Sequence, residues 1–251
     1  MKLVSFVIPL YNASASVRDL TARILSTRIP GNKQIVYIND GSTDNTDKIV
    51  RSLAAKNTSI TYIQLAANFG QHNAIITGLR YARGSIIVCL DDDLQTPPEE
   101  TSVLINEMEK RHAHVVYGQY ETNEDPIRRI GTRLHNITAQ LFGKPKAVTL
   151  TSFFCMTGAV SQRVSQYKGT LVYLPGIVLR VTKNIYSTPV RHESRKYGRS
   201  GYTFLSLMKL WAIGVLVYLH LADLYRAQPV AVIKNSVNIT STRRSRGSLH
   251  R

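Results

Sequence analysis

The sequence predicts an α/β protein with a mostly parallel central sheet and helices on both faces of that sheet. Short apolar runs alternate with helical patterns through the first half of the chain. These apolar runs are continuous rather than alternating, as expected for strands that helices cover on both sides. With 251 residues, 43% of them hydrophobic, the chain is long enough to bury such a sheet.

The first half repeats a strand–helix unit, which favours a parallel sheet. Strands are expected at residues 4–12, 34–40, 60–66 and 85–91, and helices at 16–28, 42–57 and 70–82. No GxGxxG motif follows the first strand, so a dinucleotide-binding version of this architecture has no support.

The second half has a weaker pattern. Thr96 is expected to cap a helix that starts at Pro97, with Glu99 completing a capping box. An amphipathic helix is expected from Ile127 to the stop at Gly143. Further expected elements are strands at 114–120 and 183–190, a helix near 161–167 and an apolar helix around residue 211.

The charge is distributed very unevenly. The net charge is +16; residues 1–125 hold 12 Lys/Arg and 14 Asp/Glu, whereas residues 126–251 hold 20 and 2. Such a basic half favours a polyanionic partner, either nucleic acid, phosphate groups or an anionic membrane face. The alternative is a solvated basic surface with a basic tail.

Polar residues follow the strands at the edge where open parallel sheets bind ligands. In an extended chain Asp91, Asp93 and Gln95 share one face and Asp92 points away. Their oxygens suit Mg²⁺ or Mn²⁺, and Asp40 can add a carboxylate or accept a hydrogen bond from a sugar hydroxyl. The alternative for an acidic triplet alone is a solvated turn.

Four motifs resemble the nucleotide-sugar-binding half of a family 2 glycosyltransferase, which has the GT-A fold. They are SFVIPLYN, YINDGSTDNT, NFGQHNAIITGLRYARG and LDDDLQTPPEE. GQHNAI and DLQxPPE are most similar to the polyprenyl-phosphate branch, which includes dolichyl- and undecaprenyl-phosphate sugar transferases. The resemblance covers roughly residues 3–211, and four ordered motifs at the expected strand ends make it specific.

This resemblance implies a site and a division of the chain. The residues implied to bind the nucleotide-sugar are Pro9, Tyr11, Asn12, Asp40, Asp91 and Asp92; those implied to hold Mg²⁺ or Mn²⁺ are Asp91, Asp93 and Gln95. Asp91 and Asp93 are also the expected catalytic carboxylates. One catalytic domain is expected over residues 1–225, with a nucleotide-sugar half (1–120) and an acceptor half (121–225), followed by a flexible basic tail at 226–251.

Three departures from the family pattern matter. Ala13 stands where the family commonly has Glu, so one base or ribose contact is in doubt. DDD replaces the commoner DAD. After Trp211 the family usually continues to an arginine-containing loop and often two membrane helices, and this sequence diverges there.

The acceptor is predicted to be a phosphate. A sugar-hydroxyl acceptor needs a general base, and only Glu193 and Asp223 are acidic after Asp125, neither in a convincing base motif. A phosphate is already anionic and needs cationic positioning instead. The segment RHESRKYGRSGY resembles the RxxxGxSxY segment that contacts the acceptor phosphate in the polyprenyl-phosphate branch.

The predicted acceptor-phosphate residues are Arg128, Arg129, Arg191, Arg195, Arg199 and Ser200, with Arg195 and Ser200 also expected to be catalytic. For Arg128 and Arg129 the alternative is pairing with Glu124 and Asp125. The predicted reaction is an inverting transfer from a nucleotide-diphosphate sugar to a polyprenyl phosphate in cell-envelope glycan synthesis, and the resemblance to bacterial members favours UDP over GDP.

Two other functions compete with this reading. One is a family 2 transferase that adds sugar to a saccharide hydroxyl in polysaccharide synthesis. The other is a non-catalytic basic protein that binds nucleic acid, although the basic half lacks a recognisable nucleic-acid motif, and no nucleic-acid partner is expected.

A cytoplasmic location at the inner face of the cell membrane is expected. The N-terminus has no signal-peptide pattern, and the most apolar stretch, 210–219, is too short to span a bilayer. The two cysteines lack a CxxC pattern and fit a reducing compartment. The basic half would be attracted to an anionic membrane surface by about 1 kcal/mol per Lys or Arg close to it.

Overall fold

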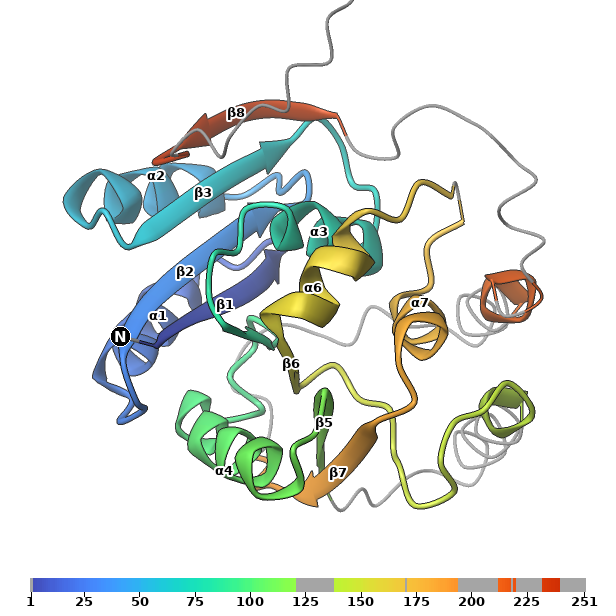
Figure 1. The fold of residues 1–251 in the computed structure, drawn as a ribbon. Helices are drawn as coiled ribbons and strands as arrows, with labels where there is room; N and C mark the ends of the chain where they lie inside the picture. Colours follow the sequence, from blue (N-terminus) through green and yellow to red (C-terminus); the bar gives the residue numbers. More distant parts are fainter. Residues whose placement is uncertain are drawn as a thin grey trace, which may run out of the picture.

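The computed structural model describes residues 2–120, 138–169, 171–193, 212–217, 219 and 232–239. One eight-stranded sheet, in the order β7-β5-β6-β4-β1-β2-β3-β8, runs through the molecule (Figure 1). Its strands are β1 (Leu3–Leu10), β2 (Asn32–Asn39), β3 (Ile60–Leu65), β4 (Ile86–Cys89), β5 (Val115–Gln119), β6 (Phe154–Thr157), β7 (Ile185–Pro189) and β8 (Ile233–Val237).

The sheet is mostly parallel, as predicted. The pairs β1–β2, β2–β3, β1–β4 and β5–β7 are parallel. Strand β6 runs antiparallel to both β4 and β5, and β8 runs antiparallel to β3.

Helices cover both faces of this sheet. They are α1 (Val17–Ser26), α2 (Thr46–Lys56), α3 (Gln71–Leu79), η1 (Pro98–Glu100), α4 (Thr101–Arg111), α6 (Gly158–Ser165) and α7 (Leu174–Val181). One buried apolar cluster joins the sheet to α1, α2 and α4, and a second joins its other face to α3, α6 and α7. Adjacent residues of β1 belong to different clusters, such as Phe6 and Val7, which explains the continuous apolar runs of the sequence.

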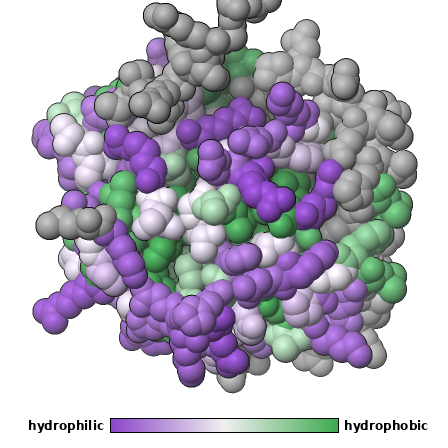
Figure 2. Space-filling model, in the orientation of Figure 1, coloured by the Kyte–Doolittle hydropathy of each residue, from purple (hydrophilic) through white to green (hydrophobic). Residues whose placement is uncertain are grey.

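The surface has the complementary pattern. On the face drawn in Figure 2, hydrophilic side chains cover much of the described part, and hydrophobic ones lie between them in separate patches. Residues 212–217 are helical, and Val217 is buried in the same cluster as α7. Among the residues that the structure describes, no helix has the length and apolarity needed to cross a bilayer.

Two local predictions were wrong. The helix after the aspartates begins with η1, Pro97 takes the N-cap position, and no side chain caps it. Glu99 bonds Arg23 instead of closing a capping box, because α1 packs beside η1 and brings a cation to the carboxylate. Residues 233–237, placed by the sequence in a flexible tail, form β8 on the edge of β3. An open strand edge offers unpaired main-chain groups, which β8 satisfies.

Candidate active site

The acidic loop lies where the strand order reverses. From β1 the chain builds outward through β2 and β3 on one side, and then crosses over to β4 on the other side of β1. The loops after β1 and β4 therefore flank a topological switch point, where open α/β sheets bind ligands. They are joined directly, since the Tyr11 N–H donates to Asp92 Oδ2 at 3.3 Å.

Asp91 is held by two side chains that the sequence analysis did not single out. Gln71 Nε2 donates to Asp91 Oδ1 at 2.6 Å, and Ser152 Oγ donates to Oδ2 at 2.6 Å. Gln71 is the first residue of α3, within the GQHNAI motif. Ser152 has no motif, but β6 pairs with β4 so that Phe154 lies opposite Cys89, and extending this register brings Ser152 opposite Asp91.

The expectation that Asp91, Asp93 and Gln95 share one face of an extended chain was wrong. Strand β4 ends at Cys89, and the backbone turns back at Leu94, where φ is +60°. The Leu94 side chain is completely buried, and this burial holds the bend. Asp93 Oδ1 accepts the Gln95 N–H at 3.0 Å, which closes a tight local turn.

Asp92 does not simply point away from the site, because it bonds the loop after β1. Burial is the main cause that raises the pKa of Asp92, to about 7; the charges of Asp91 and Asp93 add to it, and the Tyr11 N–H opposes it. Three adjacent carboxylates that repel one another are a favourable environment for a hard divalent cation.

The donor set therefore fits Mg²⁺ or Mn²⁺ in its chemistry. Within the described ranges, no three His, Cys, Asp or Glu side chains converge on one point as a ready-made metal group. This agrees with the geometry above, in which Asp91 and Asp92 face different partners. Such a site suits a metal that takes several of its ligands from substrate phosphates.

We expect the metal-free protein to lose stability as Asp92 ionises. The folded state keeps a proton on Asp92 up to about pH 7, whereas the ordinary pKa of 3.8 applies in the unfolded chain. The contribution of Asp92 to the free energy of unfolding is thus most favourable below pH 3.8 and is lost as the pH rises to about 7. Urea unfolding in the presence of a chelator measures this. The free energy of unfolding of Asp92→Asn, relative to that of the wild type, should increase from about pH 3.8 to about pH 7 and stay constant above. A difference that does not change with pH would contradict the raised pKa of Asp92.

Asp40 is a buried connector between two loops. Its oxygens accept the N–H groups of Phe69 at 2.7 Å and Gly70 at 2.8 Å, and the residue is 3% exposed. Burial raises its pKa, and the two N–H bonds oppose that shift. Gly41 beside it has φ +73°, and a Cβ there would lie 2.6 Å from the main chain of Ala67. Asp40 thus ties the end of β2 to the loop that leads into α3.

The predicted base-pocket residues lie at the end of β1. Pro9 is buried within β1, while Tyr11 is 52% exposed. Asn12 takes a left-handed conformation with φ +54°. Its Oδ1 accepts the Thr43 N–H at 2.9 Å, and its own N–H donates to Ser42 Oγ at 2.9 Å. These bonds lock the PLYN loop to the DGST loop and leave the Tyr11 ring at the surface.

Of the predicted acceptor set, the structure describes only Arg191. Arg191 follows β7 and forms an ion pair with Glu100, Nε to Oε1 at 2.6 Å. The other predicted residues, Arg128, Arg129, Arg195, Arg199 and Ser200, lie outside the described residues. Their assignment to the acceptor phosphate stays a prediction.

Comparisons with known proteins agree with this architecture. The strand order and the acidic loop at its switch point define the GT-A class of fold. The family model described as "Glycosyl transferase family 2" matches residues 5–167. The chain belongs to glycosyl transferase family 2.

Two curated relatives carry the same name, undecaprenyl-phosphate 4-deoxy-4-formamido-L-arabinose transferase. The protein of Shewanella sediminis is 33% identical over 216 residues, covering 82% of this chain and 64% of that protein. The protein of Edwardsiella ictaluri is 30% identical over 219 residues, covering 84% and 66%. The chain thus spans just under two thirds of the length of these relatives.

Solved structures show the same fold at low sequence identity. Glucosyl-3-phosphoglycerate synthase from Mycobacterium tuberculosis, in complex with Mn²⁺, UDP-glucose and phosphoglyceric acid, superposes with a TM-score of 0.64 at 16% identity, covering 87% of this chain and 80% of that one. TarS residues 1–349 from S. aureus, with UDP-GlcNAc, superposes with a TM-score of 0.54 at 16% identity, covering 86% and 67%.

Proposed function

We propose that the protein is an inverting glycosyltransferase that moves a sugar from a nucleotide-diphosphate sugar to a polyprenyl phosphate, for cell-envelope glycan synthesis. The observation that carries the proposal is the carboxylate loop at the β1/β4 switch point, in a chain whose relatives are named undecaprenyl-phosphate sugar transferases. UDP is the proposed nucleotide, supported by solved structures of the same fold that hold UDP-sugars.

In this proposal the loops after β1 and β2 bind the nucleoside. The exposed Tyr11 ring offers a face for the base, and Asn12 holds the two loops together. Both oxygens of Asp40 already accept main-chain N–H groups, so its proposed contact with the nucleoside uses the remaining lone pairs. Asp40 also fixes the position of the adjoining loop.

Mg²⁺ or Mn²⁺ would be held by Asp91, Asp93 and Gln95, and when bound it supplies Lewis-acid stabilisation of the departing nucleoside diphosphate. Gln71 and Ser152 fix the orientation of the Asp91 carboxylate. Asp92 holds the loop after β1 against the loop after β4. These contacts keep the carboxylates in place before the substrate arrives.

The acceptor phosphate then attacks the anomeric carbon from the face opposite the leaving group. A bond forms between a phosphate oxygen and the anomeric carbon while the bond to the nucleoside diphosphate breaks, which inverts the configuration. No proton has to be removed, because the phosphate is anionic at neutral pH. The guanidinium groups of the predicted acceptor-site arginines and the Ser200 hydroxyl are the proposed phosphate contacts. An anionic membrane surface is the proposed place of encounter with the lipid, on the inner face of the cell membrane.

The test is release of nucleoside diphosphate from a panel of UDP- and GDP-sugars with Mn²⁺, with and without undecaprenyl phosphate. We expect release from one donor that requires both the metal and the lipid. Release that requires a saccharide instead would favour the competing polysaccharide function, in which Glu193→Gln should abolish turnover. Donor binding without turnover with any acceptor would contradict the proposal.

We expect Ser152→Ala to lower kcat/KM for the donor about tenfold, within the range usual for residues that orient a metal ligand. The substitution removes the 2.6 Å bond that fixes Asp91 Oδ2. Steady-state kinetics at varied Mn²⁺ measures the effect. Ser102→Ala is the control, because Ser102 Oγ bonds only a main-chain oxygen of Glu99 at 3.0 Å among the contacts described. Equal activity of the two variants would contradict the role of Ser152.

A further inference from the structure

The four residues that follow β7, Val190 to Glu193, each contact a different residue between Gln95 and Tyr120 in the donor half. We call them the 190–193 segment. The Val190 N–H donates to Gln119 O at 2.9 Å, and the Glu193 N–H donates to Gln95 O at 2.7 Å. Arg191 bonds Glu100, and the His192 ring stacks on the Tyr120 ring with 4.2 Å between the ring centroids. An irregular segment with a contact at every residue is held in one position.

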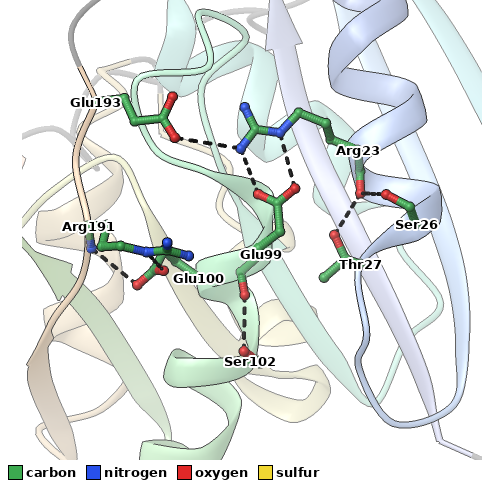
Figure 3. Close-up of polar contacts among 8 residues, drawn as sticks. All are labelled: Arg23, Ser26, Thr27, Glu99, Glu100, Ser102, Arg191 and Glu193. Carbon is green, nitrogen blue, oxygen red and sulfur yellow. Dashed lines mark hydrogen bonds and ion pairs between the residues drawn. The ribbon is translucent and has the colours of Figure 1, made fainter.

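The central contact is between Arg191 and Glu100. Glu100 Oε1 accepts from Arg191 Nε at 2.6 Å, and Oε2 accepts from the Arg191 main-chain N–H at 3.1 Å (Figure 3). The Glu100 side chain is 8% exposed, whereas that of Arg191 is 75% exposed. The carboxylate therefore bonds the main-chain N–H and the Nε of Arg191, and most of the cationic side chain faces solvent.

A second cation supports the same arrangement. Arg23 donates from Nε and Nη2 to the two oxygens of Glu99 at 3.1 and 2.7 Å, and its Nη2 lies 3.9 Å from Glu193 Oε1. Figure 3 shows Arg23 between the two carboxylates. Glu99 and Glu100 are adjacent in η1, so one short turn is linked to Arg191 directly and to Glu193 through Arg23.

The position of these contacts favours a role beyond stability. The Arg191 side chain is largely exposed, and water and salt screen its charge, which reduces the contribution of this ion pair to folding. Glu193, however, bonds the main chain of Gln95, which belongs to the loop of the proposed metal site. The contacts thus hold the 190–193 segment, which includes Arg191, against the loop that carries Gln95. Small misplacements of a binding group are costly in transfer reactions.

We infer that Glu100 is a positioning residue for the acceptor phosphate, acting through Arg191, which it orients beside the loop that carries Asp93 and Gln95. The inference rests on the proposed function, and it assigns a role to the final glutamate of the PPEE motif. The PPEE turn thereby links the donor loop to the basic segment, which continues in sequence towards Arg195.

Glu100→Gln tests this, because it keeps the shape of the side chain and removes its charge. We expect KM for undecaprenyl phosphate to rise about tenfold while kcat and the donor KM stay within about twofold, as for loss of an orienting contact. Amide hydrogen exchange in peptides spanning residues 186–193 should become faster. The double variant Glu100→Gln/Arg191→Gln should raise the lipid KM no further than Arg191→Gln does alone, because Glu100 acts through Arg191.

Glu109→Gln is the control. Glu109 also lies in α4 and forms an ion pair with Lys2 at 2.6 Å, and none of its described contacts reaches residues 186–193. It should leave both the lipid KM and the exchange unchanged. Unchanged exchange or an unchanged lipid KM in Glu100→Gln would overturn the inference.

Failure of the proposed function gives a different result. The wild type would then show no lipid-dependent release with any donor. In that case the positioning role falls with it, and faster exchange in Glu100→Gln would show a structural connection only.

Discussion

Replacing Asp93 with asparagine is expected to lower kcat/KM about 10³-fold, the scale seen when a group that stabilises transition-state charge is removed. Asp93 lies in the tight turn after β4, where its Oδ1 accepts the Gln95 N–H at 3.0 Å. Asparagine retains an oxygen for that bond, so the turn should persist. What it lacks is the negative charge that attracts the divalent cation. Nucleoside diphosphate release at varied Mn²⁺ measures the effect.

The matched control is Asp19→Asn. Asp19 is exposed in the first turn of α1, and its substitution removes the same charge from a different place. Its kcat/KM should stay within about twofold of the wild type, as for most surface changes. If Asp93→Asn turned over at the wild-type rate in Mn²⁺, the assignment of Asp93 to the metal would be wrong.

Asp40→Asn is expected to cause a large loss of stability. The carboxylate accepts two main-chain N–H groups, and an amide can accept only one of them while it turns its own NH₂ towards the other. A buried bond to a charged group contributes about 1.5–3 kcal/mol, so we expect the free energy of unfolding to fall by about 3 kcal/mol. Urea unfolding measures this, and donor affinity should fall as well, because the loop that leads into α3 loses its attachment.

Asp47→Asn serves as the control for a carboxylate near the surface. Asp47 is 36% exposed, pairs with Arg51 within α2 at 2.9 Å and accepts the Tyr62 hydroxyl at 2.6 Å. Asparagine keeps an oxygen for that hydroxyl, so the substitution should change the free energy of unfolding by less than about 1 kcal/mol. Equal decreases in the free energy of unfolding of the two variants would show that burial of the Asp40 carboxylate adds nothing to its contribution to stability.

The alternation of strands and helices could be read from the chain because it depends on local patterns. Continuous apolar runs predicted strands buried on both faces, and β1 and β2 are such strands. The places of Tyr11, Asp40 and Asp91 at strand ends were also predictable, since carboxyl ends of parallel strands meet at one edge.

Contacts between segments distant in sequence could not be read in the same way. Ser152 reaches Asp91 only because β6 enters the sheet antiparallel to β4, and no periodicity indicates a strand direction. The bend at Leu94 overturned the expectation of an extended acidic strand, because burial of one leucine outweighs the local preference of its neighbours. Arg191, expected at a phosphate, is also bonded to Glu100.

By itself the sequence determined the α/β class and the order of most elements, and it supplied the residues that we propose for the donor site. The tertiary structure alone decided which partners those residues have: Gln71 and Ser152 for Asp91, Phe69 and Gly70 for Asp40, and Glu100 for Arg191. The reason is physical. Periodicity and turn preferences depend on a few neighbouring residues, so the sequence shows them directly. The hydrogen-bond partners of a side chain depend instead on which distant elements the packed core brings within hydrogen-bond distance.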